Sequence, residues 1–152
     1  MFLDRKKLPA ECKVGFTCST FDLLHVGHIA MLREAASICN KLIVGLQVDP
    51  SVDRAEKNPP VQTLVERYGQ LNAVKFVDEI VPYQTEQDLT DILAMFQIDV
   101  RILGEEYKDK DFTGKDICRK RGIQLYFNRR DHRFSSSELR DRVAMLELDR
   151  LV

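Results

Sequence analysis

The sequence lacks the features that mark membrane, disulfide-stabilised, zinc-binding or nucleic-acid-binding proteins. No apolar run approaches the roughly 20 residues of a membrane span, and the N-terminal residues contain no apolar signal-peptide region. The four cysteines form no C-x-x-C pair and follow no zinc-ligand spacing. A net charge of −1 also lacks the basic excess of a general nucleic-acid binder. We therefore expect a cytoplasmic protein with free thiols, and neither nucleic acid nor a membrane as its partner.

The composition that remains is typical of a single globular domain. Of the 152 residues, 44% are hydrophobic and 31% are charged, which allows a core without disulfide or metal staples. No internal repeat or low-complexity linker interrupts the chain. We therefore expect one domain over residues 1–152, in which residues 1–11 form an N-terminal extension. That extension either packs on a neighbouring molecule or is disordered.

Basic side chains are concentrated in the last third of this nearly neutral chain. The cluster comprises Arg119, Lys120, Arg121, Arg129, Arg130 and Arg133. A locally basic region inside a protein of almost zero net charge suits a compact anionic ligand, because the field of the cluster acts at short range. The distribution therefore indicates a site for a small polyphosphate rather than for a long polyanion.

Short apolar runs alternate with amphipathic helical patterns along the chain. The pattern predicts strands at 12–17, 41–48, 79–82, 100–103 and 123–127. It predicts helices at 27–40, 61–74, 89–96, 115–121 and 135–148. This order is typical of an α/β fold with a Rossmann-like, doubly wound sheet of five parallel strands. Ligands of such sheets bind at the carboxyl ends of the strands, so functional residues should follow Thr17, Val48, Leu103 and Phe127.

A segment with two histidines, residues 18–28, connects the first predicted strand to the first predicted helix. Its sequence is C-S-T-F-D-L-L-H-V-G-H, and it places His25 and His28 at the helix N-terminus. Free N–H groups and the helix dipole favour an anion there, and Gly27 permits a close approach of the backbone. Two histidines alone would equally fit a metal pair or an accidental surface pair. The strand–turn–helix context favours a phosphate site, in which imidazoles donate hydrogen bonds.

A second segment, residues 130–137, precedes the last predicted helix and reads R-D-H-R-F-S-S-S. Ser135 is a good N-cap, and Glu138 stands where it would complete a capping box. The serine run therefore has a structural explanation as well as a phosphate-binding one, and the first segment favours the latter. The helix itself is predicted to turn three apolar side chains toward the interior: Leu139, Val143 and Leu146.

Residues 15–29 resemble the signature of the cytidylyltransferase-like nucleotidyltransferase superfamily, and within it the glycerol-3-phosphate type. The similarity extends from Lys13 to Val143. The family pattern R-T-x-G-I-S-T-T corresponds to residues 130–137, where Arg133 and Phe134 replace the glycine and the branched residue. The family pattern G-D-D/E-W appears as residues 104–107, G-E-E-Y. The resemblance implies a homodimer that uses Mg²⁺ with a nucleoside triphosphate.

The resemblance also implies roles for particular residues. The catalytic residues would be His25, His28, Lys57 and Arg130. The nucleotide-binding residues would be Thr20, Phe21, Gly27, Arg67, Gly104, Glu106, Ser135, Ser136 and Ser137. Those for the acceptor would be Asp22, Lys75 and Arg133, and no residue is expected to ligate a metal directly. Lys57 lies in a predicted loop, 51–60, where Arg54 is its rival, and Asp22 is expected chiefly to order its turn.

The reaction implied by the resemblance is the attack of an acceptor phosphate on the α-phosphorus of CTP, with release of pyrophosphate. Glycerol 3-phosphate, which would give CDP-glycerol, is the first candidate acceptor. Adenylyl or cytidylyl transfer to a sugar phosphate, to choline or ethanolamine phosphate, or to FMN stays open, because Arg133 and the pair Glu105–Glu106 depart from the family pattern. A non-catalytic nucleotide-binding protein would keep the same segments. A metal hydrolase using Asp22 with the two histidines is disfavoured, since no third ligand has a fitting position.

Overall fold

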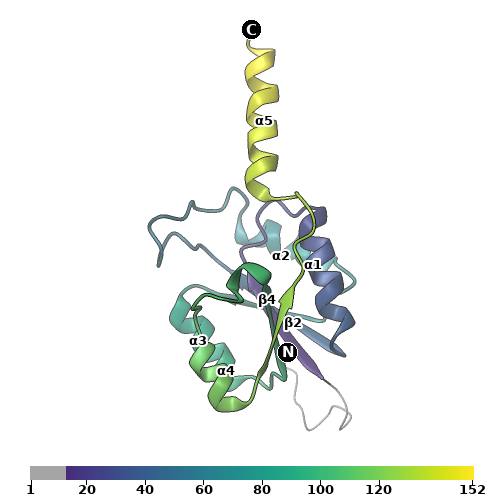
Figure 1. Cartoon of the computed structure of the whole chain (residues 1–152). Helices are drawn as coiled ribbons and strands as arrows, with labels where there is room; N and C mark the ends of the chain where they lie inside the picture. Colours follow the sequence, from purple (N-terminus) through teal and green to yellow (C-terminus); the bar gives the residue numbers. More distant parts are fainter. Residues whose placement is uncertain (1–12) are drawn as a thin grey trace.

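The computed structural model describes residues 13–152, so the predicted N-terminal extension and Cys12 lie outside the described residues. Strands and helices alternate throughout this range (Figure 1). The strands are β1 (Val14–Ser19), β2 (Lys41–Gln47), β3 (Glu79–Tyr83), β4 (Val100–Gly104) and β5 (Gln124–Asn128). The helices are α1 (Val26–Ser37), α2 (Leu64–Asn72), α3 (Glu86–Met95), α4 (Lys115–Arg121) and α5 (Ser136–Arg150), with a short 3-10 helix, η2, at Glu105–Tyr107.

The sheet has the order β3-β2-β1-β4-β5, and every neighbouring pair of strands is parallel. The chain therefore builds one half of the sheet outward from β1 and then returns to build the other half from β4. β1 pairs with β2 along its whole length, but with β4 only at Gly15 and Phe16. Because β1 and β4 are no longer paired at their carboxyl ends, the switch point between them leaves room for a ligand. The predicted Rossmann-like fold is confirmed.

Two apolar clusters cover the two faces of the sheet. One contains Leu32 of α1 and Leu71 of α2, and the other contains Leu89 of α3 and Cys118 of α4. The two faces are visible in Figure 1, where α3 and α4 lie on one side of the strands and α1 on the other. Since both faces are covered, the strands are almost continuously apolar, as the sequence of β2 already indicates.

The helix ends differ from the predicted ones by a few residues, for local reasons. α1 ends at Ser37 rather than Asn40, because the Asn40 side chain accepts a hydrogen bond from the backbone N–H of Lys13 beside β2. α2 begins at Leu64 rather than Val61, because Thr63 is its N-cap and forms a capping box with Glu66. Side-chain caps such as these set a helix start more sharply than apolar periodicity does.

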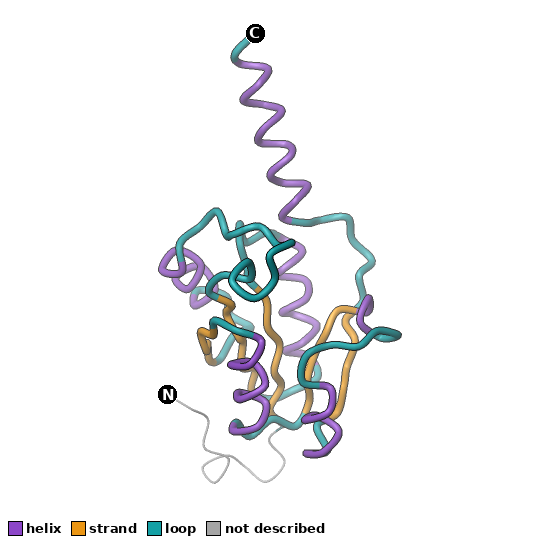
Figure 2. Tube along the Cα trace, turned by 90° about the vertical axis from the view of Figure 1, so that its left-hand side faces the viewer, coloured by secondary structure: helices purple, strands orange, loops and turns teal. Residues whose placement is uncertain are grey.

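The last helix, α5, is present, but the prediction that it turns an apolar face inward is wrong. Val143 and Leu146 are 55% and 62% exposed, and none of the residues of α5 is buried. The helix projects away from the rest of the protein in both views (Figures 1 and 2). Four other helices already cover the sheet, so α5 has no free core surface to face. Within residues 13–152, no helix combines the length and the apolar character needed to cross a membrane.

Candidate active site

A cavity of about 710 Å³ lies at the carboxyl ends of the strands. Many of the predicted site residues line it: Thr20, His25, Gly27, His28, Lys57, Gly104, Glu106, Arg130, Ser135, Ser136 and Ser137. Arg54, the rival of Lys57, lines it as well. The starts of α1 and α5, which lie more than 100 residues apart in the sequence, thus border the same space.

The two predicted histidines lie at the start of α1, and each ring accepts a hydrogen bond from a backbone N–H group there. His25 is the N-cap, and its Nδ1 accepts a hydrogen bond of 3.0 Å from the backbone N–H of Gly27. Nδ1 of His28 accepts one of 3.3 Å from the backbone N–H of His25. A neutral imidazole that accepts at Nδ1 must carry its proton at Nε2. These backbone contacts therefore leave the Nε2–H group of each ring as a donor at the cavity that both residues line.

The surroundings keep both imidazoles uncharged at neutral pH. Their rings are stacked, with 3.9 Å between the centroids. Burial, followed by the repulsion from His25, lowers the pKa of His28 to about 4. Burial also lowers the pKa of His25, with smaller contributions from His132 and Arg130. A bound anion would favour the charged forms, so the site is prepared to hold phosphate by neutral donors and to gain charge when it binds.

His132 is a third histidine at this site, and the prediction omitted it. A Cβ atom added to Gly27 would lie 2.8 Å from Cε1 of both His25 and His132, so only glycine fits between these rings. His132 lines the cavity, stacks on Phe134, and keeps a buried Nδ1 atom with no hydrogen-bond partner among the described residues. The sequence feature that could have identified His132 is its position within the second segment, residues 130–137. Local sequence pattern does not indicate that the two segments bring their imidazoles together.

Asp22 lies beside the cavity rather than in its lining. It is 5% exposed, and its carboxylate accepts 2.9 Å hydrogen bonds from the backbone N–H groups of Val61 and Gln62. It also pairs with Arg140 of α5 at 2.6 Å. Burial by itself would raise the pKa of Asp22, but these hydrogen bonds and the arginine outweigh it and lower the pKa. This position matches the expected ordering of the turn and does not support a contact with the acceptor.

Three further predicted residues also lie outside the cavity lining. Phe21 is 1% exposed in the core, with φ of 50°, and its ring lies 5.3 Å from that of His28. Arg67 is 2% exposed and donates four hydrogen bonds to carbonyl oxygens, those of Thr20, Gln47, Val48 and Gln62. Lys75 is exposed, precedes β3 at the amino-terminal end of the sheet, and lies over the Phe76 ring. Phe21 and Arg67 are thus buried residues that stabilise the loops around the cavity. The position of Lys75 does not favour its predicted role in acceptor binding.

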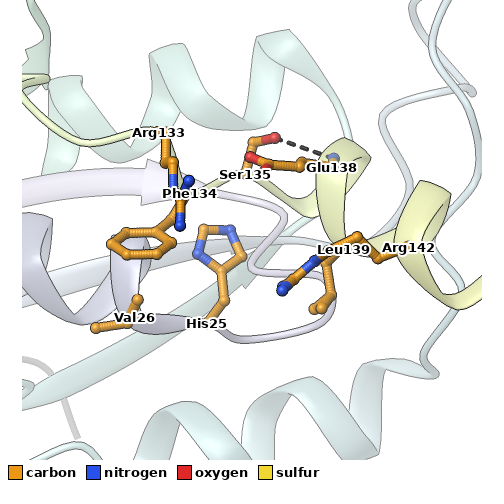
Figure 3. Close-up of a pocket in the computed structure, with 8 residues that line it drawn as sticks. All are labelled: His25, Val26, Arg133, Phe134, Ser135, Glu138, Leu139 and Arg142. Carbon is orange, nitrogen blue, oxygen red and sulfur yellow. Dashed lines mark hydrogen bonds between the residues drawn. The ribbon is translucent and has the colours of Figure 1, made fainter.

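Arg133 belongs to a second, smaller cavity of about 240 Å³, between the starts of α1 and α5 (Figure 3). The lining residues are His25, Val26, Arg133, Phe134, Ser135, Glu138, Leu139 and Arg142. His25 and Ser135 line both cavities, so Arg133 lies on the outer side of the histidine pair. Ser135 caps α5 by accepting a hydrogen bond of 3.1 Å from the backbone N–H of Glu138.

The large cavity carries two ion pairs and several residues that the prediction did not assign. Arg130 forms an ion pair of 3.6 Å with Glu106, and Arg54 one of 3.4 Å with Glu86. Unassigned residues in the lining include Cys18, Gln47, Tyr83, Glu86, Arg101, Phe112, Asn128 and His132. Gln47 and Asn128 are each 3% exposed, and each keeps one buried amide atom without a partner among residues 13–152. Such unpaired atoms are costly unless a ligand or water satisfies them.

A five-stranded parallel sheet with an imidazole-capped helix start at its switch point defines a Rossmann-like α/β domain. The family model described as cytidylyltransferase-like matches residues 16–142, and the chain belongs to this family. It is 37% identical over 118 residues to the bifunctional protein HldE of Hyphomonas neptunium and 40% identical over 107 residues to that of a Caulobacter species. These matches cover 76% and 69% of the chain, but only 24% and 22% of the two relatives. The chain thus spans less than a quarter of the length of these relatives.

Solved structures show the same fold. A lipopolysaccharide core biosynthesis protein from Thermoplasma volcanium superposes with a TM-score of 0.63 at 23% identity, over 79% of this chain and 99% of that one. Pantothenate synthetase from Thermus thermophilus superposes with a TM-score of 0.55 at 15% identity, over 82% of this chain and 57% of that one. At these identities the likeness concerns the fold alone.

Proposed function

We propose that the chain is a nucleotidyltransferase. An oxygen of an acceptor phosphate attacks the α-phosphorus of a nucleoside triphosphate, a new P–O bond forms, and the bond to pyrophosphate breaks. The observation that carries the proposal is the pair of neutral imidazoles at the start of α1, whose Nδ1 atoms are occupied by the backbone. Membership in the cytidylyltransferase-like family supports the same reaction type.

The chain's own residues would act by positioning and by charge stabilisation. The Nε2–H groups of His25 and His28 donate to phosphate oxygens at the reacting centre, where negative charge accumulates in the transition state. The N-terminus of α5 approaches the triphosphate from the other side, with Ser135, Ser136 and Ser137 in the lining. Lys57 and Arg130 supply positive charge from the rim. Since the acceptor phosphate is itself a nucleophile, no covalent enzyme intermediate is required.

Mg²⁺ would enter this scheme with the nucleoside triphosphate, whose charge it neutralises. Among the described residues no group of three or more His, Cys, Asp or Glu side chains is arranged to hold a metal ion. Mg²⁺ commonly keeps several waters and binds through substrate phosphates rather than in an all-protein cage. The residues at the site therefore fit an ion held mainly by the substrate, and none of the protein steps above depends on a protein-bound metal.

CTP and glycerol 3-phosphate are the substrates that the form of the first segment favours. A phosphorylated sugar, joined to CMP or AMP, is the second candidate. The unpaired amides of Gln47 and Asn128 favour it, because a polyhydroxylated acceptor could satisfy buried donors and acceptors in the cavity. We also propose that the protein is a homodimer, as the resemblance implies.

The decisive experiment measures pyrophosphate release from CTP and ATP, each offered with glycerol 3-phosphate, hexose 1-phosphates, choline phosphate and FMN. One pair should give turnover and a nucleoside diphosphate conjugate. His28→Ala should abolish most of that turnover, and Arg33→Ala, at an exposed position of α1 outside both cavities, should keep it. Binding of a triphosphate without turnover on any acceptor, or hydrolysis to the monophosphate without acceptor, would contradict the proposal. Sedimentation of the purified protein as a monomer would contradict the dimer.

A further inference from the structure

Arg101 on β4 is a buried cation that forms no ion pair with a carboxylate among residues 13–152. Its side chain lines the large cavity and is only 4% exposed. Removing a charge from water costs several kcal/mol, so buried arginines are usually paired with carboxylates. Within residues 13–152 no carboxylate forms an ion pair with Arg101. Its contacts with the described residues are a hydrogen bond from Nη1 to the carbonyl oxygen of Thr113, the ring of Phe112, 5.1 Å from the guanidinium carbon, and a hydrogen bond with the Cys18 thiol.

The side chains around the guanidinium do not supply the missing charge. Burial raises the pKa of the Cys18 thiol, and the opposing effect of Arg101 is smaller. Burial likewise raises the pKa of Tyr83 far above its usual range. Both groups are therefore neutral at pH 7. The carboxylate of Glu86 is paired with Arg54 at 3.4 Å. This side of the cavity thus keeps an uncompensated positive charge.

Among residues 13–152, Nη1 is the only guanidinium nitrogen of Arg101 that donates to a protein oxygen, and the weakly accepting Cys18 thiol is its one other hydrogen-bond partner. No oxygen of the described residues accepts a hydrogen bond from Nε or Nη2 of Arg101, and neither atom is sealed from solvent without a partner. These two N–H groups point in parallel, which matches two oxygens of one phosphate or carboxylate. The interaction with Thr113 fixes Nη1 and so orients this pair.

Arg101 lies on the opposite side of the sheet from the histidines. Thr17 of β1 donates to the sulfur of Met31 in α1, whereas the next residue, Cys18, packs on the cluster of α3 and α4. On β4, Val100 and Ile102 belong to the cluster of α1 and α2, so Arg101 between them faces α3 and α4. The large cavity therefore has two sides, one at the starts of α1 and α5 and one at Arg101.

We propose that Arg101 binds an anionic group of the acceptor, a phosphate or a carboxylate, through Nε and Nη2. The inference rests on the proposed function, which assigns the triphosphate to the side of the histidines and leaves the side of Arg101 to the second substrate. The acceptor is then selected for an anionic oxygen pair, with Tyr83 and Glu86 beside it as partners for hydroxyl groups. Arg101 acts in acceptor binding, whereas the histidines act on the reacting phosphorus.

A purely structural role would have a different signature. The bond to Thr113 and the contact with Phe112 tie residues 112–114 to β4, so Arg101 also stabilises this segment. Gly114, with φ of +83°, leaves no room for a side chain near Leu93 and Nη1 of Arg101. If this tie were its only role, substitution would lower the melting temperature and weaken both substrates alike. A selective loss of acceptor binding, with triphosphate binding unchanged, would distinguish the binding role from the structural role.

The test is a binding titration without turnover. The wild type, Arg101→Met and Arg101→Lys are saturated with the α,β-methylene analogue of ATP or CTP and titrated with glycerol 3-phosphate and glucose 1-phosphate. At least one probe should bind the wild type, and its Kd should rise about 100-fold in Arg101→Met, as expected for two lost charge-assisted hydrogen bonds. Arg101→Lys keeps the positive charge but lacks the two parallel N–H groups of the guanidinium, so its Kd for the probe should rise about 10-fold. Arg33→Met, at an exposed position of α1 outside both cavities, is the control and should bind as the wild type does.

Several outcomes would overturn the inference. These are unchanged probe binding in Arg101→Met, equal binding of neutral glycerol or glucose, no probe binding by the wild type, or a parallel loss of the triphosphate analogue. If Arg101→Met melts far below the wild type, Arg101→Lys carries the same comparison. Arg101-dependent binding without pyrophosphate release would contradict the proposed function but not this inference. Turnover with unchanged acceptor binding in Arg101→Met would contradict this inference alone.

Discussion

The helices α1 and α5 both begin at the large cavity, yet their bodies are held in opposite ways. α1 buries Leu32 and Ala35 completely, whereas α5 buries none of its residues. His25 caps the first helix and Ser135 caps the second. A helix can therefore contribute its N-terminus to a site although the rest of the helix does not pack in the core. Stability should depend on the body of α1, and the proposed chemistry should depend on both starts.

Polar contacts at its base attach α5 to the domain. The Ser136 hydroxyl donates to the backbone oxygen of Asp22 at 2.9 Å, and Arg140 pairs with the Asp22 carboxylate. Asp22 lies between Phe21 and Leu23, two non-glycine residues with φ of 50°. Such a backbone persists only where its surroundings fix it, here the core around Phe21 and the hydrogen bonds of Asp22. The turn after β1 therefore positions α5 over the cavity.

Substitution of one leucine in each helix, buried Leu32 in α1 and exposed Leu146 in α5, should give the largest difference. Leu32→Ala should lower the free energy of unfolding by about 2–5 kcal/mol, because it leaves a cavity in the core. Leu146→Ala, at a side chain that is 62% exposed, should change it by less than about 0.5 kcal/mol. Urea unfolding of the two variants provides the measurement. Equal losses would show that α5 packs on a surface in solution, such as a second copy of the chain.

Removal of one imidazole donor should give the next largest effect, on turnover. His28→Ala should lower kcat by about 10²–10³-fold, as the loss of one transition-state donor does elsewhere. His28→Asn keeps an acceptor near the Nδ1 position for the backbone N–H of His25 but has no donor at Nε2, so it should be equally inactive and more stable than His28→Ala. Steady-state kinetics and thermal melting test both. Normal turnover by His28→Asn would eliminate the role of the Nε2–H group.

The sequence predicted most of this fold and about half of the geometry of the site. Apolar runs and periodicity located every strand and every α-helix within residues 13–152, but not the 3-10 helix at Glu105–Tyr107. The two segments at His25 and Ser135 were found because caps and helix starts are local features. The exposure of α5, the position of His132 in the cavity lining and the lack of a carboxylate partner for Arg101 among residues 13–152 depend on which elements meet in space. Local pattern carries no such information, and the acceptor role of Lys75, taken from the resemblance, did not consider that this residue precedes β3 at the amino-terminal end of the sheet.

The pH dependence of stability should be the third effect. The pKa of His28 is about 4 in the folded protein against 6.5 for the free side chain, so the unfolded chain binds more protons between these values. Stability should therefore fall as the pH falls through this range, by about 2 kcal/mol between pH 6.5 and 5 from this residue. Denaturant unfolding of the wild type and His28→Asn at both pH values measures the difference. A wild-type loss no larger than that of His28→Asn would contradict the depressed pKa.

The smallest effect should come from the cap of α5. Ser135→Ala removes the acceptor for the backbone N–H of Glu138, which typically costs about 1 kcal/mol of helix stability. Because α5 is not part of the core, this loss should appear as local fraying rather than as global destabilisation. Hydrogen exchange should become about 5-fold faster at the first amides of α5 and stay unchanged in α1. Ser137→Ala, inside the first turn, is the matched control and should leave exchange unaltered. Faster exchange in both helices would mean that α5 contributes to the core after all, and the contrast with α1 would no longer hold.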